Sequence, residues 1–204
     1  MPAVTQELLR SLYGRAGHAP PAARVARPPA RPRRAEPEPE PDASPLSFEE
    51  ALRFLEGVRD RGAIAHTVLR YARSKFRRAV LLTVNRGVVQ GWAGLAERLG
   101  TREIRRISIR LGAPGILDTV VRTRAHLLGP IPKTEANVRL LKQLGGGVPA
   151  NAFLVPILAL GRVVNVFYVD AGRGEAVDAS AVGELLILAT RIAKSYDALL
   201  SRLR

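Results

Sequence analysis

Two apolar runs in the last third of the chain give its clearest pattern. They span residues 152–160 and 163–169, and only Gly161-Arg162 separates them. A Gly-X pair between runs rich in β-branched and aromatic residues predicts a β-hairpin with a type II′ turn, because glycine adopts the positive φ that this turn needs. Neither run alternates between apolar and polar positions, so we expect both faces of the hairpin to be covered. Pro156 cannot donate to a ladder, so it should lie at a bulge or an unpaired position.

The rest of the chain from Ser47 onward predicts helices and strands in alternation. Ser47 and Glu50 form a capping-box pattern before an apolar stripe, which is typical of a helix start. Alternation of Ile with Arg and Ser over 104–111 predicts a strand with one wet face. The predicted helices are 47–60, 63–75, 114–125, 134–144 and 179–204, and the predicted strands are 79–84, 88–92, 104–111 and a short extended stretch at 126–131. These elements predict an α/β (α+β) domain with a central, largely antiparallel sheet of five to six strands, flanked by helices and ending in a long C-terminal helix.

The sequence predicts three segments. Residues 1–18 contain a short amphipathic stretch that either frays or docks on a protein partner through Leu8, Leu9, Leu12 and Tyr13. Residues 19–45 are rich in Pro, Ala, Arg and Glu and have almost no large apolar side chains, so we expect a disordered linker. Residues 46–204 form the folded domain.

The net charge and the absence of Cys limit the binding partners and the reactions that this chain can have. The net charge is +14, with Arg far outnumbering Lys. This favours either an Arg-rich composition without a role or an anionic partner, such as an acidic protein or lipid surface. No nucleic-acid motif is present and aromatic residues are few, which disfavours nucleic acid. The chain has no Cys, which excludes disulfides, Cys-based metal sites and a thiol nucleophile. No apolar run approaches the roughly 18 residues of a membrane span, so we expect a cytoplasmic protein.

The search for catalytic groups predicts none. His66 and His126 have no second ligand at metal-pair spacing, and Ser195 near Asp197 lacks an accompanying His. The carboxylates Asp118, Asp170 and Glu175 are assigned to loop capping. We therefore predict no catalytic residues, no metal and no cofactor, and we predict that the chain is not an enzyme.

Three segments together resemble the GAF domain family, which shares its architecture with PAS-like sensors. Residues 76–87 (FRRAVLLTVNRG) are similar to the family's first helix running into its first strand. Residues 154–170 (LVPILALGRVVNVFYVD) resemble the penultimate hairpin, and the apolar-striped helix from Ala179 resembles the C-terminal helix. The resemblance covers residues 47–204. The Asn-Lys-x-Phe-x-Asp signature of cyclic-nucleotide-binding members is absent, as is a Cys for a bilin or for methionine sulfoxide reductase activity.

The absence of catalytic groups, the length and apolar stripe of the last helix, and the N-terminal motif predict a non-catalytic GAF-like regulatory module that acts through protein–protein interaction as a homodimer. The predicted dimer interface lies on the first and last helices, at Leu52, Leu55, Leu185, Ile192, Tyr196 and Leu199. The resemblance also leaves open a small-molecule sensor for an anion or nucleotide, and a basic binder of nucleic acid or anionic membrane. The ligand site that it implies contains Trp92, Arg110, His126, Asn165 and Tyr168, although Trp92 and Tyr168 also suit core positions.

Overall fold

The computed structural model describes residues 44–96 and 99–201, and all of these except Ser44 belong to one compact unit, Pro45–Arg204. The predicted docking segment with Leu8, Leu9, Leu12 and Tyr13, and nearly all of the predicted linker, lie outside the described residues. In chain order the elements are α2 (Phe48–Glu56), α3 (Arg61–Ala72), β1 (Arg78–Asn85), β2 (Val88–Leu95), α4 (Thr101–Arg105), β3 (Ser108–Arg110), α5 (Ile116–Thr123), β4 (Leu127–Gly129), α6 (Glu135–Gln143), β5 (Ala152–Ala159), β6 (Arg162–Asp170) and α7 (Ala179–Ser201).

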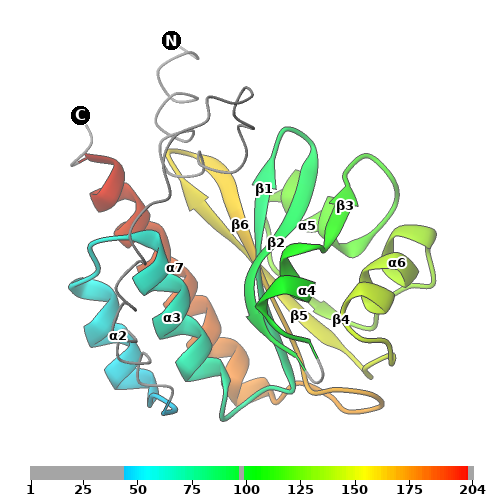
Figure 1. The fold of residues 1–204 in the computed structure, drawn as a ribbon, viewed down its shortest axis with the longest axis horizontal. Coiled ribbons are helices and arrows are strands. Elements are labelled where there is room, and N and C mark those ends of the chain that lie inside the picture. Colours follow the sequence, from blue (N-terminus) through cyan, green and yellow to red (C-terminus); the bar gives the residue numbers. More distant parts are fainter. Residues whose placement is uncertain (1–43, 97–98, 202–204) are drawn as a thin grey trace, which may run out of the picture. The chain divides into compact units, whose positions relative to one another are not determined.

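The six strands form one sheet in the order β3-β2-β1-β6-β5-β4, and every neighbouring pair is antiparallel. Strands β1, β5 and β6 are buried along almost their whole length. Helices α2, α3 and α7 cover one face of the sheet and α4, α5 and α6 cover the other (Figure 1). This arrangement confirms the predicted fold class and the prediction that both faces of the central hairpin are covered.

The predicted helix start at Ser47 is confirmed in detail. The Ser47 hydroxyl accepts the Glu50 amide at 3.2 Å, and the Glu50 carboxylate accepts the Ser47 amide at 2.8 Å, which completes a capping box. The next helix, α3, begins one residue after Asp60, whose carboxylate accepts the Ala63 amide at 2.8 Å. The capping box at α2 and the N-cap hydrogen bond at α3 both satisfy backbone amides that have no partner within the first turn of a helix.

The turn between β5 and β6 differs from the prediction. Ala159 pairs with Arg162, so the turn residues are Leu160 and Gly161, with φ of +48° and +73°. Two successive positive φ values define a type I′ turn and not type II′. The reason is a β-bulge between Ile157 and Leu158, which shifts the register by one residue and leaves two residues between the strands.

The predicted strand over 104–111 is wrong in its first half. Residues 101–105 form helix α4, and only Ser108–Arg110 extends as β3. Ile104 and Ile107 are both buried, and their spacing of three puts them on one face of a helical turn but on opposite faces of a strand. The helix packs closely on β2 at Gly91, where an added Cβ would lie 1.8 Å from the Ile104 carbonyl oxygen. This contact is available only to a glycine.

A buried ion pair ties together one end of the sheet. The Arg78 Nε lies 2.8 Å from the Asp170 carboxylate, and both side chains are almost fully buried. The Arg78 guanidinium also donates to the Gly146 carbonyl at 2.7 Å, and the Tyr168 hydroxyl donates to Asp170. Burial, and then the neighbouring carboxylate, raises the pKa of Tyr168. The network therefore keeps a neutral Tyr168 beside a charged pair and joins β1 and β6 to the loop after α6.

Candidate functional site

Between the sheet and helices α4, α5 and α6 lies the region that the resemblance implied as a ligand site. Apolar side chains from both layers meet there in one buried cluster. Its members include Val80, Leu82, Val89, Ile104, Ile107, Ile109, Ile116, Leu117, Val120, Leu140, Leu144, Val166 and Tyr168. A cavity of about 10 Å³ remains, beside Ile109 and Leu117. That is about the space that one water molecule needs, so the region is filled by the protein itself.

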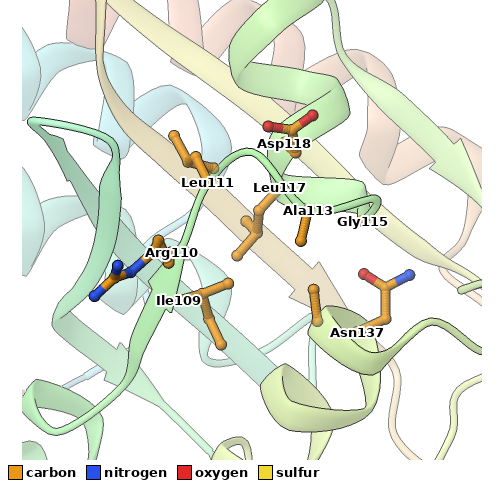
Figure 2. Close-up of a pocket in the computed structure, with 9 residues that line it drawn as sticks. Ile109, Arg110, Leu111, Ala113, Gly115, Leu117, Asp118 and Asn137 are labelled. Atoms are coloured by element: carbon orange, nitrogen blue, oxygen red, sulfur yellow. The ribbon is translucent and has the colours of Figure 1, made fainter.

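Two polar side chains fasten the loop that closes this region (Figure 2). Asn137, which is buried on α6, accepts the Ile116 amide at 2.9 Å and donates to the Pro132 carbonyl at 2.8 Å. It thereby satisfies a free amide at the start of α5. Asp118 accepts the Gly112 amide at 2.9 Å, as the assignment to loop capping predicted. No local pattern in the sequence indicates this role of Asn137, because its partner Ile116 lies 21 residues away.

We call residues 99–144 the cover layer, and its outer surface is strongly cationic. It contains nine basic and three acidic residues, whereas residues 47–77 and 179–201, which carry α2, α3 and α7, together contain nine basic and six acidic. All nine basic side chains are exposed, and among the described residues only Arg122 has a carboxylate within 4 Å, that of Asp118 at 3.9 Å. We call them the cationic surface: Arg102, Arg105, Arg106, Arg110, Arg122, Arg124, Lys133, Arg139 and Lys142.

The five residues of the implied ligand site do not come together. Trp92 packs against α3, with the Arg61 guanidinium carbon 4.3 Å from its ring centroid. Asn165 is buried and donates to the Leu82 carbonyl at 3.1 Å. Because side chains alternate along a strand, it lies on the face of β6 opposite to Tyr168. The other two, Arg110 and His126, are exposed, and Figure 2 shows the Arg110 side chain extending away from the small cavity.

The six residues of the implied dimer interface mostly pack within the chain's own core. Leu55, Leu185, Ile192, Tyr196 and Leu199 are buried, and Leu52 is half-buried. On the same helices the exposed large apolar side chains are Phe54 on α2 and Ile187 on α7, each 52% exposed. The apolar stripe of α7 is therefore used mainly to cover the sheet and contact α2 and α3.

The described residues show neither a cluster of metal ligands nor a membrane-spanning helix. No three His, Asp or Glu side chains in the described part of the chain converge as metal ligands would. None of the helices described is both long enough and apolar enough to cross a bilayer.

Comparison with solved structures identifies the fold of this chain, whereas comparison of sequences identifies no family. Neither the protein-family models nor the curated protein sequences contain a match to this chain. Solved structures do match. The GAF domain of a phosphoenolpyruvate-protein phosphotransferase from Coxiella burnetii has a TM-score of 0.62 at 12% identity, covering 76% of this chain and 93% of that one. The phycoerythrobilin-bound GAF domain of a cyanobacterial phytochrome has a TM-score of 0.60 at 11% identity, covering 77% and 98%. The fold of this chain is therefore GAF-like.

A third similar structure corrects the prediction that the chain is not an enzyme. Free methionine-R-sulfoxide reductase from Neisseria meningitidis, solved with its substrate, has a TM-score of 0.60 at 13% identity, covering 76% of this chain and 89% of that one. The reductase from Staphylococcus aureus is also similar. Because proteins with this fold include catalysts as well as sensors, a GAF-like fold does not imply the absence of an activity. The prediction of a non-enzyme rested on the absence of recognisable catalytic groups in the sequence, and these enzymes with the same fold contradict it.

Proposed function

We propose that this chain is a regulatory module with a GAF-like fold that works by binding another protein. The observation behind this proposal is the filled region under the cover layer, where about 10 Å³ remains. Ligand pockets for small molecules usually measure about 300–1,000 Å³. A sensor that held its ligand at this position would need a different arrangement of α5 and α6, which Asn137 and Asp118 fasten in place.

The cationic surface is the proposed binding face, and an acidic protein surface is the proposed partner. Its charge would speed association with such a partner and make that association sensitive to salt. The exposed face lacks aromatic side chains for stacking on bases, since Trp92 lies on the other side of the sheet against Arg61. This favours a protein over single-stranded nucleic acid.

Affinity capture from the native cell, with nuclease present, tests this proposal. The bait is the full chain, and the variant Arg105→Glu/Arg106→Glu reverses two charges of the cationic surface. The matched control, Arg59→Glu/Arg73→Glu, reverses two exposed charges just before and just after α3, outside the cationic surface. We expect one acidic protein to be captured by the full chain and by the control but not by the variant. Equal capture by both variants would contradict the proposed face, and capture that nuclease abolishes would indicate a nucleic acid instead.

We also propose that the chain forms a homodimer through the outer faces of α2 and α7. Phe54 and Ile187 support this, because they are the large apolar side chains that these helices expose among the described residues. Light scattering on the full chain should give twice the monomer mass of 22.1 kDa at tens of micromolar. Ile187→Glu should return the mass to that of the monomer, while Leu128→Glu, on the exposed edge strand β4, should not. A monomer mass for the parent chain would contradict the dimer without affecting the proposed partner face.

A further inference from the structure

A second cavity lies on the opposite face of the sheet from the filled region. It measures about 280 Å³ and is bounded by α7, by β5 and by the segment between α5 and β4. Seven of its ten lining residues are apolar, and they include Val155 and Pro156 on β5 and Leu186 and Ala189 on α7. None of the described residues that line it is acidic. It is therefore an apolar hollow of nearly the size of a small-ligand pocket.

The hollow exists because two neighbouring elements leave space along β5. Strand β4 pairs with β5 only as far as Leu154, so the edge of β5 beyond that residue has no neighbouring strand. Opposite this edge, α7 presents the small side chains of Ala189 and Ala193. Pro156 lies in this stretch without a neighbouring strand and has no amide hydrogen, which disfavours the addition of another β-strand there. The shape suits a compact ligand better than a strand from a second protein.

One end of the hollow is cationic. Arg124 and His126 line it there, just beyond α5. The Arg124 guanidinium makes no hydrogen bond or ion pair with the described part of the chain, and the His126 ring rests against Phe153 at 5.9 Å between centroids. Arg124 also has φ of +56° at the C-terminal cap of α5, a left-handed position that glycine usually occupies. An arginine at this strained position points to a use for its side chain.

We propose that this hollow binds a small anionic amphiphile, with its apolar chain along α7 and its carboxylate or similar head group on Arg124 and His126. At about 30 Å³ for each water-sized group, the cavity has room for roughly nine such groups. An eight-carbon carboxylate, with eight carbon and two oxygen atoms, is close to that size and matches the distribution of polar and apolar lining. Arg124 supplies charge-assisted hydrogen bonds to the head group, and His126 supplies a ring N–H.

Calorimetric titration of the full chain with octanoate tests the site, and octylammonium is the probe with the same chain and the opposite charge. We expect one octanoate per chain with a dissociation constant of about 1 mM or tighter. Octylammonium should bind at least about tenfold more weakly. Ala193→Leu should abolish octanoate binding by filling the hollow from α7.

The decisive variant is Arg124→Gly, because it removes the guanidinium and supplies the residue that the left-handed backbone prefers. Its melting temperature should equal or exceed that of the parent chain, while its affinity for octanoate falls about tenfold. The matched control is Arg122→Ala, which removes an exposed guanidinium of α5 outside the hollow and should leave the affinity unchanged. Equal binding of the two probes, unchanged affinity in Arg124→Gly, or no octanoate binding at about ten times the expected constant would each overturn the proposal.

Discussion

Individual glycines in this chain have very different structural roles, and the sequence alone does not distinguish them. Gly91 allows α4 to lie against β2, since any Cβ there would lie 1.8 Å from a backbone oxygen. Gly183, on the exposed side of α7, has no atom within 4 Å of the position that a Cβ would occupy. Whether a glycine is required thus depends on which segment approaches it.

Gly91→Ala should destabilise the domain by about 3 kcal/mol, because α4 must move away from β2 and uncover buried Ile104. Gly183→Ala should stabilise it by about 0.5–1 kcal/mol, since alanine has less conformational freedom to lose in a helix. Urea unfolding followed by circular dichroism measures both changes. Similar effects of the two substitutions would show that α4 does not pack on Gly91 in this way.

The Arg78–Asp170 pair gives a second test at the level of residues. Arg78→Met should cost about 3–5 kcal/mol, because it leaves the buried Asp170 carboxylate without its cation. Asp170→Asn should cost a similar amount. The double variant should lose at least about 1 kcal/mol less than the sum of the two, and equilibrium unfolding of all four chains measures this coupling. Additive losses would mean that the two groups do not interact.

At the scale of elements, helix α7 connects the sheet to α2 and α3. Its buried stripe covers β5, and its polar side chains reach neighbouring helices. Glu184 accepts from the Tyr71 hydroxyl and from the Lys75 ammonium, each at 2.5 Å. The hydrogen bond from Lys75, and then that from Tyr71, lowers the pKa of the Glu184 carboxyl below its ordinary 4.5. This group therefore stabilises the fold while it is ionised.

The lowered pKa of Glu184 predicts a pH dependence. Its contribution is present above the ordinary pKa of 4.5 and is lost as the pH falls through the lower folded value. Glu184→Gln should cost less than about 1 kcal/mol at pH 7, because the pair is about one third exposed. The difference between the parent chain and the variant should shrink as the pH falls from 7 through the lowered pKa of Glu184, and it should vanish once the carboxyl is protonated in both states. Urea unfolding at pH 7 and at a series of pH values below 4.5 measures this, and a constant difference would refute the assignment.

At the scale of the whole molecule, the described hydrophobic core lies entirely between Leu46 and Leu200. The start of this unit is held by a hydrogen bond within the unit itself, since the Leu46 amide donates to the Arg70 carbonyl at 3.3 Å. The two faces of the sheet differ in charge, with the excess of basic residues in the cover layer. Stability and charge asymmetry are thus both properties of the compact unit.

A chain of residues 44–204 should therefore fold on its own. Its thermal midpoint should lie within about 2 °C of that of the full chain, because no described core residue is removed. Calorimetry of both chains at equal concentration measures the difference. A drop of much more than that would mean that residues 1–43 contribute to the folded core.

The sequence by itself determined the elements whose signals are local. The capping box at Ser47, the central hairpin and the apolar stripe of the last helix all follow from residues within a few positions of one another. Together they were enough to predict a GAF-like α+β domain. The turn type and the start of β3 could not be read in this way, because a bulge and the packing of α4 on Gly91 decided them.

Only the tertiary structure decided where the binding surfaces lie. The period of two shows which residues of β6 share a face, but it does not show which face the cover layer packs against. The predicted ligand site therefore combined Asn165 and Tyr168, although these residues lie on opposite faces of the sheet. Likewise, the region that resembled a ligand pocket is filled, and the larger hollow lies by Arg124, where β4 ends early. These outcomes depend on how segments distant in the sequence fill space against each other, and local patterns do not contain that information.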